Sequence, residues 1–271
     1  LMIMLSSLTP VVNANDVPST GVSEASQVRE RGGLAPVDIK KWVGDTVDWK
    51  DGVKAKDSVS EENKAKINEL LKEARFEDAT DTARNTDKVS EKKIIKGEIK
   101  EGFKGNIKVR FKDNSTITVE NQTLYVSDFI TSSSNENAPT DAIEVKFKLG
   151  EGVKVEEKDQ TTGEVKKTIK GDKDKPVSYK EYKVKPGTDF STYKYPVLKK
   201  TIFDLIDEQA DEGYADPVWK NNQNGDDFVA TDNNNVFTAT ATKTFKVTVK
   251  ANGGTGEDII KIKKSGENFI L

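Results

Sequence analysis

Two residue types that carry much of protein chemistry are missing from this sequence of 271 residues, which has no cysteine and no histidine. Without cysteine the chain has no disulfide, no thiol nucleophile and no thiolate ligand for zinc. Without histidine it lacks the commonest acid-base catalyst and metal ligand near neutral pH. We therefore expect no catalytic residue, no metal and no cofactor in this segment.

Aromatic residues are scarce at 7%, and hydrophobic residues make up only 34% of the chain against 33% charged residues. This balance favours one to three small domains with a high ratio of surface to volume. The net charge is -3, with both signs interspersed, so no basic stripe predicts a nucleic-acid partner. No apolar run approaches the roughly 20 residues that a membrane span requires. We therefore expect no membrane span in the mature chain.

Residues 1–14 form the most apolar segment, an uncharged run that ends in Val12-Asn13-Ala14 before a polar stretch. Apolar residues followed by small ones are typical of the core and cleavage site of a signal peptide. The sequence has neither a starting Met nor the usual basic segment before this run, so the hypothesis is a signal-peptide remnant cut after Ala14. A buried N-terminal strand is the alternative, although Pro10 suits a strand poorly.

Residues 15–33 show no periodicity and are rich in Ser and Gly, which predicts a flexible linker. Organised sequence begins at Leu34. Within the unit 34–130, the apolar residues of segment 60–74 lie at the spacing of one helix face. Ser58 and Ser60, which come before the first of these apolar residues, are candidate caps. We predict a helix there.

After this helix the apolar period changes to two. Residues 107–111 and 117–119 alternate apolar with polar side chains around Asp113-Asn114, which predicts a hairpin with a two-residue turn. The lysines and arginines between the apolar positions are typical of the solvated face of a sheet.

Residues 131–141 (TSSSNENAPTD) are predicted to be a linker between domains. A second unit, 142–244, begins with alternating apolar residues and contains a charged hairpin or loop over 156–175. Residues 196–213 have apolar side chains at helical spacing, which predicts a helix that stops at Gly213. Strands, then a helix, then strands indicate an α+β domain of β-grasp type.

Residues 245–271 contain one more alternating run and a Gly-rich turn, too little for an independent domain. We expect them to be the truncated start of a third repeat. Docking of this hairpin on the second unit is the alternative.

Several of these blocks resemble modules of Gram-positive cell-wall proteins. Residues 76–78 (FED), 84–87 (RNTD) and 105–113 (GNIKVRFKD) resemble the Rib-type repeat, which implies an Ig-like, mainly β fold and a role as a stalk module. The predicted helix 60–74 departs from the simplest Rib pattern. The fold class expected for the chain is therefore α+β, mainly β, with its modules arranged as beads on a string.

The second and third units carry resemblances of their own. Residues 145–152 (VKFKLGEG), 202–206 (IFDLI) and 213–219 (GYADPVW) are similar to mucin-binding and streptococcal tandem-repeat modules, which implies a β-grasp fold. Residues 245–256 (FKVTVKANGGTG) resemble the start of an internalin-type repeat. Such proteins are typically exported and attached to peptidoglycan by a C-terminal sorting signal.

Candidate ligand-binding residues are few. Most aromatic side chains are expected in the cores of such small domains, and Tyr193 and Tyr195, which alternate before Pro196, are the candidates for exposed ligand contacts. The Asn/Asp cluster 221–227 and the pair Asp172 and Asp174 lack the spacing of a calcium loop and are interpreted as turn residues.

Three functions fit this pattern. The favoured one is a secreted, cell-wall-associated adhesin or stalk, non-catalytic in this segment and held to peptidoglycan through a region beyond Leu271. A second is the specific binding of a host extracellular protein or glycan, for example by strand addition at a sheet edge. The third is a spacer for a wall-associated enzyme whose catalytic domain lies beyond Leu271.

Overall fold

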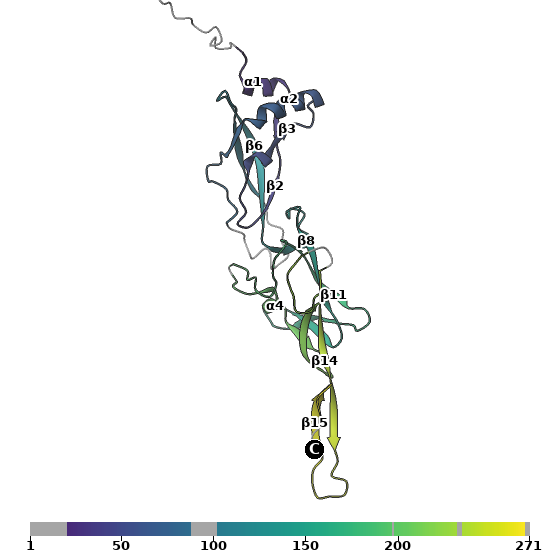
Figure 1. Ribbon diagram of the computed structural model, residues 1–271. Coiled ribbons are helices and arrows are strands. Elements are labelled where there is room, and N and C mark those ends of the chain that lie inside the picture. The colour runs from purple at the N-terminus through teal and green to yellow at the C-terminus, as the bar shows by residue number, and fades with distance from the viewer. Residues whose placement is uncertain (1–20, 88–101, 197, 232–234, 269–271) are drawn as a thin grey trace, which may run out of the picture.

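The computed structural model describes residues 21–87, 102–196, 198–231 and 235–268. Two β-rich units follow each other along one long axis, and a hairpin continues that axis at the C-terminal end (Figure 1). Helices are few and short beside the strands, so the expected α+β, mainly β class is confirmed at that level. The signal-peptide remnant predicted for residues 1–14 lies outside the described residues. No helix of the described ranges is long and apolar enough to cross a bilayer.

The first unit is built on a four-stranded sheet with the order β2-β6-β5-β4. Its strands are β2 (Ile39–Trp42), β4 (Arg75–Asp78), β5 (Phe103–Arg110) and β6 (Thr116–Ser127). A separate pair joins β1 (Leu34–Pro36) to β3 (Val53–Ala55), which follows the 3-10 turn η1 (Trp49–Gly52). Strand β2 runs parallel to β6, whereas the other pairs are antiparallel.

The helix predicted for residues 60–74 is confirmed as α2 (Glu61–Lys72). The Ser60 side chain accepts a hydrogen bond from the Asn63 N–H and satisfies one of the unpaired donors at the helix start. Ile67 and Leu71, four positions apart, are buried in the core of the unit.

The linker predicted over residues 15–33 is wrong for its second half, which contains α1 (Glu24–Glu30). Ser23 caps this helix, and its buried residues Ala25 and Val28 join the same core as α2. The two helices lie together at the N-terminal end of the unit (Figure 1). A short Ser- and Gly-flanked helix with only two core residues gives almost no periodic signal, and tertiary packing stabilises it.

The β5–β6 hairpin is confirmed, but its turn has three residues rather than two. The Phe111 N–H donates to the Ser115 carbonyl, so residues 112–114 form the loop. Asn114 adopts a left-handed backbone with φ of 66°. Asparagine tolerates that conformation better than most residues, which explains why the Asp-Asn pair marked the turn correctly.

Residues 131–141 are not a free linker, because contacts hold them to both units. Strand β7 (Ile130–Ser132) pairs with β11 (Val177–Val184). The buried Asn135 amide donates to the hydroxyls of Ser127 and Thr131. Polar composition suggested a flexible segment here, but these polar side chains bond to one another within the fold.

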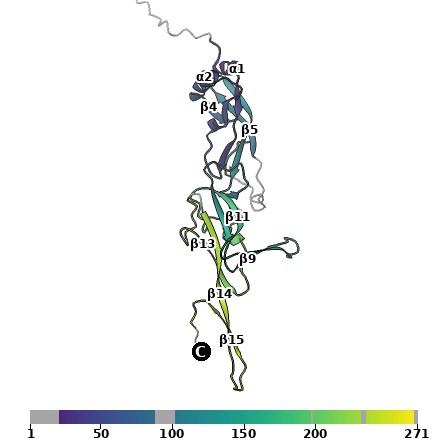
Figure 2. The ribbon, with the colours of Figure 1, turned by 90° about the vertical axis from the view of Figure 1, so that its right-hand side faces the viewer.

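The second unit is organised around a five-stranded path, β13-β14-β8-β11-β7, with a three-stranded sheet, β10-β9-β12, beside it. The further strands are β8 (Ile143–Leu149), β9 (Val153–Lys158), β10 (Val165–Lys170), β12 (Glu208–Ala210), β13 (Tyr214–Asn221) and β14 (Asn235–Val249). Strands β8 and β14 are parallel neighbours at its centre. The hairpin or loop expected over 156–175 is the β9–β10 hairpin, which projects sideways in Figure 2.

The helix predicted over residues 196–213 is wrong except for one turn, α4 (Ile202–Leu205). At Ile206 the backbone becomes extended, with ψ of 121°, and β12 follows at once and pairs with β9. The apolar residues do have helical spacing, but residues 208–210 pair with β9 instead of continuing the helix.

The boundary predicted between residues 244 and 245 falls inside one continuous strand. β14 has 15 residues; its first part pairs with β8 and β13, and its last part pairs with β15 (Ile259–Lys264). The hairpin is thus an extension of the second unit's own sheet strand.

Candidate binding cleft

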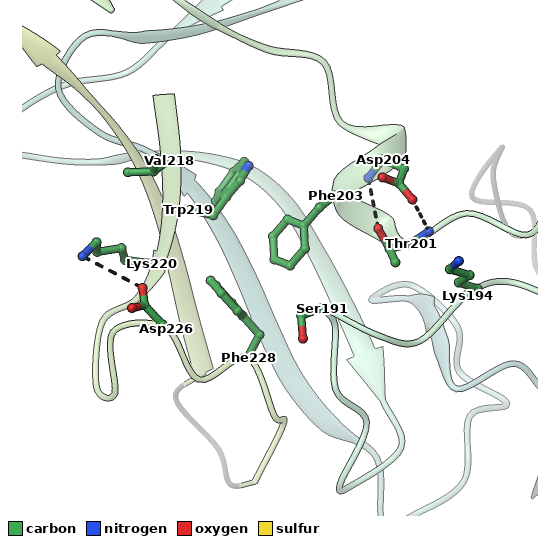
Figure 3. A pocket seen from close by; sticks show the side chains of 10 residues that line it. All are labelled: Ser191, Lys194, Thr201, Phe203, Asp204, Val218, Trp219, Lys220, Asp226 and Phe228. Atoms are coloured by element: carbon green, nitrogen blue, oxygen red, sulfur yellow. Dashed lines mark hydrogen bonds and ion pairs between the residues drawn. The ribbon is translucent and has the colours of Figure 1, made fainter. Parts of the chain in front are cut away.

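An open cleft of about 910 Å³ lies on the second unit beside α4 and β13. Its floor is made by three aromatic side chains, Phe203, Trp219 and Phe228, which come together at the centre of Figure 3. The ring centres of Phe203 and Phe228 are 5.0 Å apart, and those of Phe203 and Trp219 are 6.1 Å apart. Phe147 packs behind this group in the core.

Four charged residues surround the aromatic floor. Lys220 and Asp226 lie on one side, with Nζ and Oδ1 4.0 Å apart, and Lys194 and Asp204 lie on the other (Figure 3). Both signs of charge therefore face any molecule that enters. A concave apolar surface with a few polar groups at its border is the usual form of a small-ligand site.

The position of Phe203 is fixed by the start of α4. The Thr201 N–H donates to the Asp204 carboxylate at 2.9 Å, and the Asp204 N–H donates back to the Thr201 hydroxyl at 3.2 Å. This reciprocal cap holds the single helical turn that presents Phe203 to the cleft. The hydrogen bonds from Thr201, together with Lys194 and Lys200, hold the pKa of Asp204 below its ordinary value. Asp204 is thus an anion near neutral pH and unsuited to donate a proton there.

Strand β13, which supplies Val218, Trp219 and Lys220 to the cleft, is an edge strand of its sheet. Asn221 exchanges both of its backbone hydrogen bonds with Gly225, on the side away from β14. Because backbone groups alternate in direction along an antiparallel strand, the N–H and C=O of Trp219 also point away from β14. No other strand of the described residues pairs with Trp219 on that side.

A half-buried carboxylate lies near the Trp219 side chain. Burial raises the pKa of Glu208 on β12, and the indole N–H of Trp219 offsets part of that effect. The aromatic floor thus has an acidic group of raised pKa behind it, and ionised Asp204 at its border. The arrangement is suited to holding an amphipathic molecule, with a flat apolar face on the rings and polar groups at the border.

The two tyrosines expected to be exposed are not in this cleft. Tyr195 is 2% exposed, so the expectation of exposure is wrong for it. Tyr193 is half-buried, stacks on Phe129 with ring centres 5.0 Å apart and donates its hydroxyl to Asp128. The alternation before Pro196 indicated an edge, but both rings pack inward. A ligand contact by either tyrosine stays a prediction.

Sequence reasoning missed the cleft because its aromatic residues are far apart in the chain. Trp219 was expected in the core, and it is indeed largely buried while also forming the floor. The cluster 221–227 uses its side chains in a turn: the Asn221 amide donates to the Asp227 carbonyl, and the Asp227 carboxylate accepts the Val229 N–H. Only Asp226 of that cluster reaches the cleft.

A second set of motif residues lies in the first unit and is structural. Arg84 of the RNTD block is buried and pairs with Asp78 of the FED block at 3.1 Å. It also donates to the carbonyls of Phe103 and Gln122, and its guanidinium lies 4.7 Å from the Trp49 ring centre. All of these interactions are internal, so they account for the burial of Arg84 and stabilise this edge of the sheet.

The chain was compared with protein-family models, with curated proteins and with solved structures, and none of the three comparisons found a match.

Proposed function

We propose that this chain is a segment of a secreted, modular cell-surface protein that acts as an adhesin or stalk at the bacterial cell wall. The observation that supports this proposal is the end-to-end arrangement of two β-rich units with a bonded junction (Figure 1). A series of units along one axis gives reach away from a surface.

The junction is short and is held by polar contacts from both units. The Trp42 indole N–H of the first unit donates to Asp141 at 2.9 Å, and the Lys40 ammonium donates to the Glu136 carbonyl at 2.9 Å. Lys185, just after β11, lies 3.3 Å from Asp45 and 4.5 Å from the Phe129 ring centre. A stalk requires limited bending between its units, and we expect these contacts to contribute to that limit.

The proposal also assigns each part of the chain to a type of module. The first unit is proposed as a Rib-like module, the second as a β-grasp-like module with β8 and β14 as its paired central strands, and residues 245–271 as the start of a third repeat. A non-catalytic role is supported by the absence of histidine and cysteine from the sequence.

Surface exposure can be tested on cells that produce the full-length protein, with antibodies raised against residues 21–268. We expect labelling of intact cells and its loss after brief treatment of those cells with protease. Labelling that requires permeabilised cells would contradict the proposal.

Adhesion through the cleft can be separated from a passive spacer role. Val218, at the border of the cleft, is 47% exposed, and Val165, on β10, is 44% exposed. If the cleft binds host protein or glycan, Val218→Arg lowers attachment of purified protein to immobilised host extracellular matrix, and the control Val165→Arg does not. If Val218→Arg and Val165→Arg attach equally well, the cleft does not bind the host matrix and this segment acts only as a stalk.

A further inference from the structure

A threonine in the central sheet of the second unit has a buried hydroxyl group without a hydrogen-bond partner. Thr238 of β14 is 9% exposed, and its Oγ1 atom is buried and bonds to no other described residue. An unpaired buried hydroxyl costs free energy, and most buried polar groups in folded proteins are paired. Valine has nearly the same shape and suits a strand without this cost. The stability of the fold therefore does not explain a hydroxyl at this position.

Thr238 lies in the middle of a row of side chains that crosses four strands. It pairs with Lys220 of β13 on one side and with Lys148 of β8 on the other, and Lys148 pairs with Ser178 of β11. Paired residues of neighbouring strands project from the same face of a sheet. This face is the one that points away from the core, because Phe237, the residue before Thr238, is buried in the core.

Positive charge is not balanced in this row as it is in the rows beside it. In the next two rows along β8 and β11, a lysine on one strand has a glutamate opposite it on the other: Lys146 with Glu181, and Lys183 with Glu144. Lys148 instead has a hydroxyl-bearing residue on each side. No ion pair joins Lys148 to another residue of the described ranges. An excess of positive charge therefore lies beside the unpaired hydroxyl.

The second lysine of the row is also available to a ligand. Lys220 Nζ lies 4.0 Å from Asp226 Oδ1, and the two side chains are 60% and 91% exposed, so this ion pair is weak. In Figure 3 the Lys220 side chain points away from the aromatic rings of the cleft. Neighbouring strands are about 4.8 Å apart, so Lys220 and Lys148 begin about 10 Å apart with Thr238 between them. Their long, flexible side chains can approach one another above its hydroxyl.

We propose that Lys148, Lys220 and Thr238 form a binding site for a sulfate or phosphate ester group. The two ammonium groups supply positive charge, and the hydroxyl donates to an oxygen of the ligand, which enters between the two flexible lysine side chains. A tetrahedral oxyanion presents an oxygen to each of these three donors, whereas a carboxylate has only two oxygens. Binding also gives the buried hydroxyl the partner that it lacks in the fold.

This site does not depend on the proposed adhesin role, and it shares only Lys220 with the border of the cleft. General attraction to polyanions does not account for binding, because the chain as a whole has a net charge of -3.

The test uses the full chain and two fluorescent probes, a heparin hexasaccharide with sulfate groups and a glycerol phosphate hexamer with phosphate esters. We expect anisotropy to show binding of at least one probe, which weakens as salt rises because exposed charges are screened. The more tightly bound probe identifies the group. Lys148→Gln/Lys220→Gln should bind that probe about tenfold more weakly. The control Lys158→Gln/Lys167→Gln, which removes two exposed charges from the β9–β10 hairpin, should bind it nearly as the natural chain does.

Variants of Thr238 separate a specific site from charge attraction alone. Thr238→Val should bind the probe severalfold more weakly, while its melting temperature stays the same or rises, because the unpaired hydroxyl is gone. Thr238→Ser keeps a hydroxyl and should bind more tightly than Thr238→Val. The proposal is overturned if the natural chain binds neither probe, if the lysine variant binds as well as its control, or if Thr238→Val binds like the natural chain. A lower melting temperature for Thr238→Val also overturns it, since the hydroxyl would then be bonded within the protein.

Discussion

The guanidinium of Arg84 is enclosed by the first unit, since the residue is 9% exposed and bonds to Asp78, Phe103 and Gln122. A buried charge is stable only while its partners remain, because it has given up its water. Gly105 lies so close that an added Cβ would come within 2.6 Å of the Arg84 side chain. The RNTD block is therefore explained by packing and by charge pairing.

Replacing Arg84 with alanine removes the guanidinium that is paired with the Asp78 carboxylate. We expect Arg84→Ala to lower the free energy of unfolding of the first unit by about 3–5 kcal/mol. Urea denaturation followed by circular dichroism measures this, with the exposed Arg75 of β4 as the control, where alanine should cost less than about 1 kcal/mol. Similar losses at both positions would show that the pair is not the cause.

The same ion pair predicts acid sensitivity. Burial by itself raises the pKa of Asp78, but the hydrogen bonds from Thr80 and Arg84 and the guanidinium charge outweigh it, so the pKa lies below its ordinary value. A lowered pKa stabilises the fold above the unfolded-state value, near 4, and this stability is lost as pH falls through the folded-state pKa. The melting temperature of the first unit should therefore fall below about pH 4. Asp78→Asn should flatten that fall, whereas Asp51→Asn, at an exposed position, should leave it intact.

Short elements are where local sequence signals and tertiary contacts compete. Helix α2 has a cap and, over its 12 residues, apolar side chains at the three- and four-residue spacing of one helix face, so the sequence predicts it well. Residues 202–206 have the same spacing but become one helical turn, because β9 offers the following residues a strand partner. Helix α1 is the opposite case. Its sequence gives only a weak helical signal, but two of its side chains, Ala25 and Val28, are buried in the core.

The contribution of α1 can be measured at Val28. This side chain is 0% exposed, so Val28→Ser puts a hydroxyl into an apolar core and should destabilise the first unit by about 2 kcal/mol. Hydrogen exchange of the α2 amides, read by mass spectrometry, should speed up accordingly. Val22→Ser, at a position 53% exposed, is the matched control and should not change α2 exchange. If α1 were only a linker, both variants would behave alike.

At the scale of the whole molecule, the junction determines how far the units can bend. Its polar contacts join Trp42 to Asp141 and Asp45 to Lys185, across residues that were expected to be a free linker. Side-chain bonds of this kind leave no trace in composition, because Ser, Asn and Asp are equally common in linkers and in packed turns.

Removing both acidic groups should loosen the junction. The chain has no cysteine, so Ser58→Cys and Thr161→Cys, at exposed sites of the two units, allow specific dye labelling. In single-molecule energy transfer we expect Asp45→Ala/Asp141→Ala to broaden the distribution of distances, because it removes the Asp45–Lys185 ion pair and the hydrogen bond from Trp42 to Asp141 that join the units. The loss of stability should be small, because a partly exposed ion pair contributes little. The control Asp51→Ala should keep the original width. An unchanged width in the double variant would mean that other contacts hold the units.

The sequence by itself determined the mainly β class, helix α2, the β5–β6 hairpin and the absence of thiol and imidazole chemistry, and it left residues 156–175 as either a hairpin or a loop. These follow from local period, turn residues and composition. Only the tertiary structure decided that α1 packs on the core, that 131–141 is bonded in place and that β14 runs on into the hairpin. It also decided the cleft, because Phe203, Trp219 and Phe228 meet through long-range strand pairing that no local pattern encodes.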